Sequence, residues 1–250
     1  MKLKVGEIDP FSSLAYPQKS SIVIYLQGCN FRCPWCWNRE YLDPIAGKDK
    51  EIEEVIQEVK EDPSDTEAVV IDGGEPTKQP RALQELCERL KEDGYKVQIN
   101  TNGSNPDVIE ELGMKKNVDR VALDVKAPPD FQRRYSKIIG RKIKKKHLKG
   151  VKQVLRISNV FEFELEPRTT VIPGLTDNKH WIGKTAKTIG IYADLHVLQA
   201  FTPTKGTLKQ EYQEEKRINR EKLLELAEES KKYVKNVRIR TQETGTEQIV

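Results

Sequence analysis

Apolar runs alternate with amphipathic stretches along most of the chain. The run SIVIYLQ at 21–27 predicts a buried strand, and EAVVIDGG at 67–74 predicts a second strand that ends in two glycines. Between these runs, apolar residues recur at helical spacing, at Ile52, Val55, Ile56 and Val59. This part of the chain therefore predicts a strand–helix–strand unit.

The same alternation continues to the end of the sequence. Further strands are predicted at 95–103, 118–129, 162–172, 194–200 and 236–240. Further helices are predicted at about 80–93, after Asn105 as a cap and Pro106 as the first residue, at 178–189 and at 219–235. Six or seven strand–helix units with short connections predict an α/β fold, in which right-handed crossovers curl a parallel sheet into a full or partial barrel. We expect one domain over residues 1–250, with a core at about 18–205 and a C-terminal helix and strand at 217–241 packed on it.

Composition narrows the classes of protein that fit this pattern. Hydrophobic residues make up 36% of the chain and charged residues 33%, which is typical of a globular fold with a densely charged surface. The net charge of +4 comes from 43 basic and 39 acidic residues, so it does not predict nucleic-acid binding over the whole surface. The apolar run at 22–26 is too short for a signal peptide or a membrane span. We therefore expect a cytoplasmic protein without a membrane partner, in which cysteines stay reduced.

Three of the four cysteines lie within the segment GCNFRCPWCWN at 28–38. A structural zinc site needs four ligands and disulfides need pairs, so the trio of Cys29, Cys33 and Cys36 suggests a metal site with one open position. The alternative is a zinc site whose fourth ligand is His147, His180, His196 or Cys87. No histidine has finger-like spacing to the trio, and Cys87 falls on an apolar helical face with Leu83, Leu86 and Leu90.

Several motifs follow the predicted strands directly. Gly73-Gly74-Glu75-Pro76 follows the second strand, Thr101-Asn102-Gly103 follows the third, and Asp124 with Lys126 ends the fourth. Chemistry in parallel barrels lies on the loops at the carboxyl ends of the strands, so these residues and the cysteines should face one mouth. Such a mouth could hold a small zwitterionic ligand beside the thiols.

The spacing C-x3-C-x2-C, with Trp35 before the last cysteine, resembles the signature of the radical S-adenosylmethionine (radical SAM) superfamily. Gly73-Gly74-Glu75-Pro76 is similar to the second motif of that superfamily. The resemblance implies that Cys29, Cys33 and Cys36 bind three irons of a [4Fe–4S] cluster, while the fourth iron binds the amino and carboxylate groups of S-adenosylmethionine. The open position would then belong to a substrate.

A narrower resemblance extends over nearly the whole chain. It rests on the segments FSSLAYPQKSSIVIYLQGCNFRCPWCWN, DGGEPT, TNGS, DVKAPP, RTTVIPGLTDN, LQAFTP and REKLLELAEE. Their order is similar to that in the activating enzymes of glycyl-radical proteins, above all the activating proteins of anaerobic ribonucleoside-triphosphate reductase, and also to pyruvate formate-lyase activating enzyme. This resemblance implies one electron from a flavodoxin or ferredoxin, cleavage of S-adenosylmethionine to a 5′-deoxyadenosyl radical, and abstraction of hydrogen from a glycine of a partner enzyme.

The same resemblance implies roles for individual residues. Trp35 would pack near the adenine, Asn38 would help to hold the cofactor, and the backbone of Gly73, Gly74 and Glu75 would meet its amino group. The remaining contacts to S-adenosylmethionine would come from Asn100, Asn102, Asp124, Lys126 and Arg168. A lysine and an arginine suit a carboxylate as charge-assisted hydrogen-bond donors.

The stretch RKIKKKHLKG at 141–150 is strongly basic. A solvated helix face is the default interpretation, and a docking patch for an acidic protein or for RNA is the sharper one. The alternative function is accordingly a radical SAM enzyme that modifies RNA or a small metabolite, with residues 141–149 as its substrate contact. Because the sequence carries no second cysteine cluster, activation of a glycyl-radical enzyme such as anaerobic ribonucleotide reductase is favoured, and nucleic acid is not.

Overall fold

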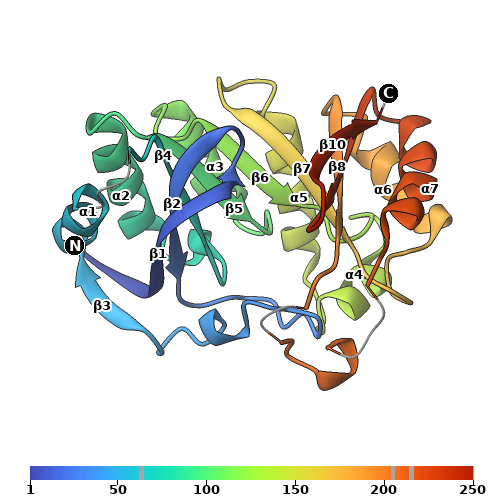
Figure 1. Ribbon diagram of the computed structural model, residues 1–250, viewed down its shortest axis with the longest axis horizontal. Coiled ribbons are helices and arrows are strands. Elements are labelled where there is room, and N and C mark those ends of the chain that lie inside the picture. The colour runs from blue at the N-terminus through green and yellow to red at the C-terminus, as the bar shows by residue number, and fades with distance from the viewer. Residues whose placement is uncertain (62–64, 204–205, 214–216, 250) are drawn as a thin grey trace.

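The computed structural model describes residues 1–61, 65–203, 206–213 and 217–249. Its centre is a ten-stranded sheet with the strand order β10-β9-β8-β7-β6-β5-β4-β2-β1-β3, which curls into a partial barrel (Figure 1). The strands are β1 (Lys2–Tyr16), β2 (Lys19–Leu26), β3 (Lys48–Glu51), β4 (Ala68–Gly73), β5 (Lys96–Thr101), β6 (Arg120–Asp124), β7 (Glu164–Val171), β8 (Leu195–Ala200), β9 (Asn236–Thr241) and β10 (Gly245–Ile249). The helices are α1 (Ile52–Lys60), α2 (Pro80–Glu92), α3 (Pro106–Met114), α4 (Gln132–Ile138), α5 (Lys145–Ile157), α6 (Lys179–Ile189) and α7 (Arg220–Lys231).

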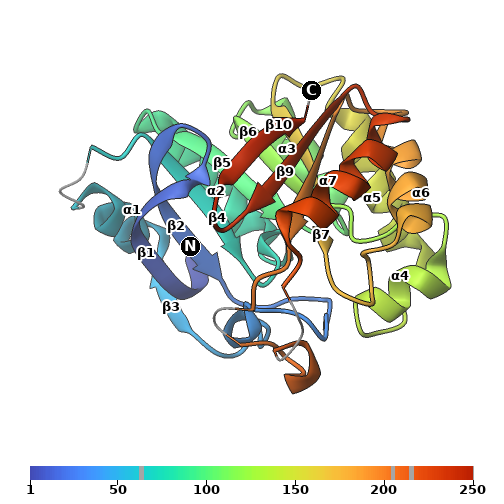
Figure 2. The ribbon, with the colours of Figure 1, turned by 45° about the vertical axis from the view of Figure 1, so that its right-hand side comes forward.

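In this spatial order, every pair of neighbouring strands from β9 through to β2 is parallel. Helices cover the outer face of the sheet, as the view in Figure 2 shows for α5, α6 and α7. The predicted α/β fold with a parallel sheet curled into a partial barrel is therefore confirmed. Among the described residues, no helix combines the length and the apolar character that crossing a membrane requires.

Apolar residues on alternate strand positions explain where the core lies. In β4, Val69 and Ile71 belong to the large core between sheet and helices, whereas Ala68 and Val70 belong to a small cluster with Val23. Successive side chains of a strand point to opposite faces, so a continuous apolar run is buried on both. Helix α1 presents to the large core the apolar face that its spacing predicted.

Four elements were not predicted: β1, β3, β10 and α4. A helix was the default interpretation of 141–150, whereas α5 begins at Lys145 and extends to Ile157. Strand β1 pairs antiparallel with β2, and its register shifts near Val5, Asp9 and Ser12. Antiparallel strands such as these give a weak local signal, because their stability depends on pairing with other strands. Asn105 is also corrected: it lies at the cap position of α3, but its amide donates to the Thr77 carbonyl and hydroxyl oxygens instead of capping the helix.

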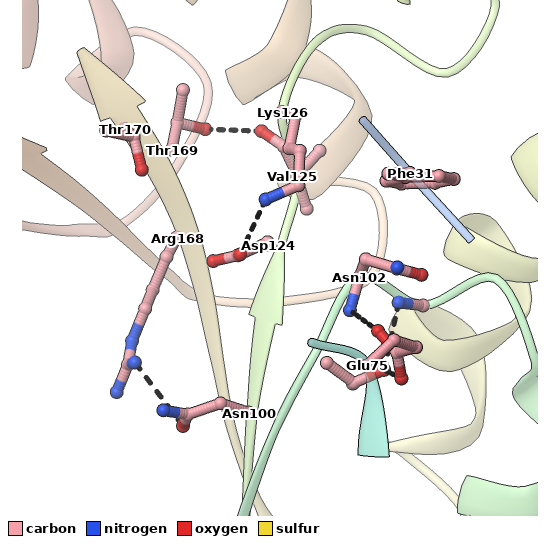
Figure 3. A network of polar contacts seen from close by, with 12 residues as sticks. Phe31, Glu75, Asn100, Asn102, Asp124, Val125, Lys126, Arg168, Thr169 and Thr170 are labelled. Carbon is pink, nitrogen blue, oxygen red and sulfur yellow. Dashed lines mark hydrogen bonds and ion pairs between the residues drawn. The ribbon is translucent and has the colours of Figure 1, made fainter. Parts of the chain in front are cut away.

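A buried hydrogen-bond chain links α7 to the end of β6. His196 lies between the hydroxyls of Thr169, 2.9 Å from Nε2, and Ser230, 2.8 Å from Nδ1. The Thr169 hydroxyl donates to the Val125 carbonyl at 2.8 Å, so it accepts from His196 Nε2–H, and Nδ1 accepts from Ser230. The neutral ring therefore fixes the backbone of Val125, next to Lys126 (Figure 3).

Burial lowers the pKa of His196 to about 3. An unfolded histidine binds a proton below about pH 6.5, so between that pH and 3 the unfolded state holds the extra proton and stability falls as the pH falls. As the pH is lowered from 6 to 4, we expect the unfolding free energy of the wild type to fall by about 1.4 kcal/mol more per pH unit than that of a His196→Gln variant. Urea unfolding at each pH measures this, with His180→Gln as a control on the surface. Equal slopes in the wild type and His196→Gln would contradict the assignment.

Candidate active site

A cavity of about 490 Å³ lies inside the partial barrel, at the carboxyl ends of the parallel strands. It brings together every residue that the sequence predicted for the site. They are Cys29, Cys33, Trp35, Cys36, Asn38, Gly73, Gly74, Glu75, Asn100, Asn102, Asp124, Lys126 and Arg168. Figure 3 shows part of this wall, with residues from the ends of β5, β6 and β7 beside Glu75.

The cysteine loop, defined as residues 29–36, follows β2 and is fixed by its backbone. The amide of Phe31 donates to Cys29 Sγ at 3.3 Å, and the amide of Cys36 donates to the Cys33 carbonyl at 3.0 Å. Trp35 is buried and donates its indole N–H to the Ile138 carbonyl at 2.9 Å. The end of α4 therefore braces the loop from outside the cavity.

Cys33 is buried, and Cys29 and Cys36 are partly buried. Burial raises the pKa of Cys29 to about 12, and it raises the pKa of Cys33 and Cys36 as well. Without a positive partner these thiols keep their protons, whereas a metal that binds them displaces the protons and supplies the charge that a thiolate needs.

The loop after β4 is tied to the start of the cysteine loop. The amide of Gly74 donates to the Leu26 carbonyl, and the amide of Glu75 donates to the Gly28 carbonyl, both at 2.9 Å. A Cβ on Gly74 would lie 2.4 Å from the Tyr41 carbonyl oxygen and 2.6 Å from that of Gly28. Only glycine allows this approach of two backbones, so the glycine motif sets the distance between the two loops.

Glu75 connects the loops after β4 and β5 through its side chain. Its Oε1 accepts from Thr77 and from the Thr101 hydroxyl at 2.7 Å, and its Oε2 accepts from the Asn102 amide at 2.7 Å. The side-chain amide of Asn102 in turn donates to Asn30 Oδ1 in the cysteine loop at 2.9 Å. The buried carboxylate thus fixes the position of Asn102 relative to the cysteines.

Replacing Glu75 with glutamine should destabilise the protein by about 2 kcal/mol, because an amide N–H₂ then faces donors where the carboxylate accepted hydrogen bonds. Urea unfolding of Glu75→Gln measures the loss. Glu67→Gln, at an exposed position, is the matched control and should stay within about 0.5 kcal/mol of the wild type. A Glu75→Gln variant as stable as the control would show that the carboxylate is not needed to join the loops.

The end of β6 places a cation beside the tryptophan. Lys126 Nζ lies 2.7 Å from Asp124 Oδ2 and 4.9 Å from the centre of the Trp35 ring. Burial opposes its charge, but the neighbouring groups, with Asp124 first among them, together outweigh burial and raise the Lys126 pKa. Lys126 is therefore a fixed positive charge within the cavity.

Asn100 on β5 lies between Asp72 on the adjacent strand β4 and Arg168 on β7, which is the second strand on the other side. Its Nδ2 donates to Asp72 Oδ2 at 2.6 Å, and its Oδ1 accepts from Gln98 at 2.8 Å and from Arg168 Nη1 at 3.5 Å. Burial raises the pKa of Asp72, although the hydrogen bond from Asn100 counteracts the increase. Asp72 was not predicted from the sequence.

A set of charges on the inner face of the barrel was also missed. Glu166 accepts hydrogen bonds from three guanidinium groups on β6, β7 and β9, those of Arg120, Arg168 and Arg240. Burial alone would raise the pKa of Glu166, but these cations hold it well below its usual range. The signal was the alternation of charged residues in FEFELEPRTTV, since alternate positions of a strand share one face.

Further residues that sequence reasoning did not place in the site also line the cavity. They include Tyr25, Trp37, Thr170, Gln199 and Arg240. Tyr25 and Trp37 lie on either side of the cysteine loop and Thr170 lies on β7 with Arg168, whereas Gln199 and Arg240 lie on β8 and β9, for which no site residue was predicted. Their arrangement became visible only once the strands were placed side by side.

The zinc alternative lacks a fourth ligand. Cys87 is buried in α2, and His196 is bonded to Thr169 and Ser230. Neither these residues nor His147 or His180 belong to the described wall of the cavity. In the described part of the chain, no three His, Cys, Asp or Glu side chains are grouped so as to hold one metal ion.

The family model of the radical SAM superfamily matches residues 23–188, which include the cysteine loop and the ends of β2, β4, β5, β6 and β7. The chain belongs to the radical SAM superfamily. It is an enzyme, and its cofactors are a [4Fe–4S] cluster and S-adenosylmethionine.

Two relatives place this radical SAM enzyme among the activating enzymes. A candidate glycyl-radical enzyme activating enzyme from Methanocaldococcus jannaschii is 39% identical over 244 residues, which are 96% of this chain and 97% of that protein. Pyruvate formate-lyase-activating enzyme from Clostridium pasteurianum is 30% identical over 192 residues, which are 74% of this chain and 76% of that protein. The chain therefore belongs with the glycyl-radical enzyme activating enzymes.

The fold is also shared with solved structures. The structure of TYW1 with a lysine-pyruvate adduct bound matches with a TM-score of 0.65 and 19% identity, covering 90% of this chain and 77% of that one. At this identity the likeness establishes the fold alone.

The residues present fit the two cofactors. In a [4Fe–4S] cluster three cysteines bind three different irons, so the cysteines are farther apart than the ligands of a single ion. The three cysteines of this chain line one cavity, in agreement with such a site. The cavity also holds the cations Lys126 and Arg168 and the acids Asp72 and Asp124. This mixture of charges suits a ligand that carries both an amino and a carboxylate group.

Proposed function

We propose that this radical SAM enzyme installs a glycyl radical on a partner protein, and that the partner is anaerobic ribonucleotide reductase. The observation that carries the activase function is the similarity along nearly the whole chain to a candidate glycyl-radical enzyme activating enzyme. The choice of partner rests on the finer resemblance of the sequence segments. We also propose a cytoplasmic location and a flavodoxin or ferredoxin as electron donor.

The rim of the cavity supports a protein as the substrate. Leu14 on β1 is 80% exposed and Trp37 after the cysteine loop is 44% exposed, and both line the cavity. Large apolar side chains left in solvent around a pocket are typical of a surface that binds another protein. A glycine within an extended segment of the partner could therefore reach the interior between them.

The residues of the chain bind, orient and protect. When bound, the cluster and S-adenosylmethionine supply a one-electron cleavage that generates a hydrogen-abstracting radical. Cys29, Cys33 and Cys36 would hold the cluster, while Lys126 and Arg168 would donate charge-assisted hydrogen bonds to the carboxylate. Trp35, buried beneath Lys126, would limit the access of water to the reacting atoms.

The remaining polar groups would complete the cofactor site. The Asn38 amide donates to the Gly73 carbonyl at 3.2 Å, which would orient the glycine backbone toward the amino group. Asn100, Asn102 and Asp124 would contact the ligand from the ends of β5 and β6. The hydrogen bonds that the Asn102 backbone amide donates to Glu75 and that Asn100 donates to Asp72 would hold these groups in place before the ligand binds.

The test is an anaerobic reaction of the reconstituted, reduced enzyme with S-adenosylmethionine and the reductase. Electron paramagnetic resonance records the glycyl doublet, and chromatography measures 5′-deoxyadenosine. We expect a doublet on the reductase that a Cys33→Ala enzyme does not produce. Cleavage of S-adenosylmethionine without the doublet would reject this partner, and no cleavage at all would reject the proposed chemistry.

A further inference from the structure

The segment that joins α4 to α5 and the first turns of α5, whose backbone Figure 2 shows, carry a basic patch together with Lys78 from the loop after β4. It consists of exposed side chains, those of Lys78, Arg141, Lys142, Lys144, Lys145, Lys146 and Lys149. Within the described part of the chain, none of these side chains forms an ion pair. The patch is therefore a concentration of positive charge without internal compensation.

The stability of the fold does not explain these charges. Helix α5 begins with Lys145 and Lys146, and its first turn contains no acidic residue. The N-terminus of a helix carries a partial positive charge, so lysines there are unfavourable. His147 feels the same crowding: burial, followed by Lys146 and other cations of the patch, lowers its pKa. An external anionic partner would compensate the repulsion.

The patch touches the cysteine loop on its outer side. Arg141 Nη1 donates to the Asn30 carbonyl at 3.0 Å, directly after Cys29. The preceding residue, Gly140, packs so closely on the loop that a Cβ would lie 2.0 Å from the Arg32 carbonyl oxygen. The Arg32 amide donates to the Ile139 carbonyl at 3.1 Å. One continuous segment thus joins the patch to the residues between the cysteines.

A second connection comes through α5 and the loop after β5. Gly150 in α5 packs against the Gly103 carbonyl, which would lie 2.8 Å from a Cβ. Asn102, beside Gly103, donates to Asn30 Oδ1, and Asn30 donates to Ser104 Oγ at 2.8 Å. The helix that carries the lysines is therefore connected to the same residue of the cysteine loop, Asn30, through the loop after β5.

The patch does not form part of the described cavity wall, although the cysteines do. A substrate that reacts inside the cavity would therefore not contact these lysines at its reacting end. A partner that docks on the patch would instead lie over the outer side of the loop that holds the cluster ligands. This position suits a protein that delivers an electron and exchanges no atoms.

We propose that the basic patch is the docking site of an acidic one-electron carrier protein. The carrier is oxidised by one electron and the cluster is reduced by one electron, with no bond to carbon formed or broken in this step. Complementary charges speed encounter and orient the carrier, and redox partners bind through small, weak interfaces of this kind. The inference rests on the proposed function, because an electron carrier is needed only if the cysteine loop holds a cluster that is reduced.

The test uses Lys145→Glu combined with Lys146→Glu. Lys187→Glu combined with Lys235→Glu is a control of equal charge change at exposed lysines elsewhere. Glutamates at the start of α5 suit the helix, so the patch variant should unfold at a midpoint no lower than the wild type. Reduced flavodoxin of acidic surface charge serves as the probe. We expect its affinity for the cluster-free protein and its rate of reducing the loaded protein to fall about tenfold or more in the patch variant at low salt, and in the control much less.

A chemical reductant separates docking from chemistry. With dithionite, 5′-deoxyadenosine formation should be equal in the wild type and the patch variant. No cleavage by the wild type with dithionite would reject the proposed function, while flavodoxin binding would still test the patch. Unchanged flavodoxin binding and reduction in the patch variant would overturn the inference. Loss of affinity for a transfer RNA probe, with flavodoxin reduction unchanged, would also overturn it and assign the patch to RNA.

Discussion

Replacing Cys33 with alanine is expected to lower the rate of S-adenosylmethionine cleavage by at least about 100-fold, since even residues that only support a metal ligand contribute 10–100-fold. Cys33 is the middle ligand of the trio and is buried against the cavity. The substitution leaves two cysteines, which cannot hold three irons. Iron and sulfide content, the absorbance of the reconstituted cluster and 5′-deoxyadenosine formation measure the result.

The fourth cysteine provides the matched control. Cys87 is also buried, but it lies in α2 with no role at the cavity. Cys87→Ala should lower stability by about 1 kcal/mol through lost packing and leave the cluster content unchanged. If Cys87→Ala lost the cluster as completely as Cys33→Ala, or if Cys33→Ala kept it, the assignment of the trio would be wrong.

Replacing Gly74 with alanine is expected to destabilise the protein by about 3 kcal/mol and to reduce cluster retention. The added Cβ meets two carbonyl oxygens, those of Tyr41 and Gly28, at 2.4 and 2.6 Å. Both oxygens belong to the backbone. The Tyr41 carbonyl accepts from the Gly28 amide and the Gly28 carbonyl accepts from the Glu75 amide, so neither oxygen can turn away without breaking a hydrogen bond. The cysteine loop begins at Cys29, directly after Gly28, and would have to move. Urea unfolding and iron content measure the two effects.

Gly183→Ala is the control for adding a methyl group to a buried glycine. Its Cβ would approach the Glu229 carboxylate at 2.8 Å, but this is the end of a flexible side chain that can shift. Alanine also favours the helix α6 by up to about 1 kcal/mol relative to glycine. We expect Gly183→Ala to be at least as stable as the wild type. A Gly74→Ala protein of wild-type stability would show that the loop after β4 does not fix the cysteine loop.

The glycine and cysteine variants both test the cysteine loop, which is rigidly attached to the rest of the protein. The loop is held by the glycine motif on one side, by Asn102 and Ser104 through Asn30 on another, and by the end of α4 through Trp35. A site that must bind a cluster and a substrate at fixed distances requires such support, because reactivity depends strongly on small displacements.

The sequence was sufficient to predict the members of the site. All of the residues predicted for cofactor binding line the cavity, because each lies in the carboxyl-terminal part of a parallel strand or in the loop after it, and parallel strands end at the same edge. The core strands and helices were likewise predicted with bounds close to those observed, since their apolar periodicity is strong. These features depend on residues that are near one another in the chain.

The tertiary structure decided what depends on distant residues. Strand β1 forms through pairing with β2 and β3, and Arg141 of the basic patch donates to the Asn30 carbonyl across more than a hundred residues. Glu166 forms ion pairs with arginines from three strands, and Gly74 contacts Tyr41 only after two loops have folded together. The sequence by itself determined which groups carry the chemistry, whereas long-range packing determined what holds them and what surrounds them, because contacts between remote segments leave no local periodicity to read.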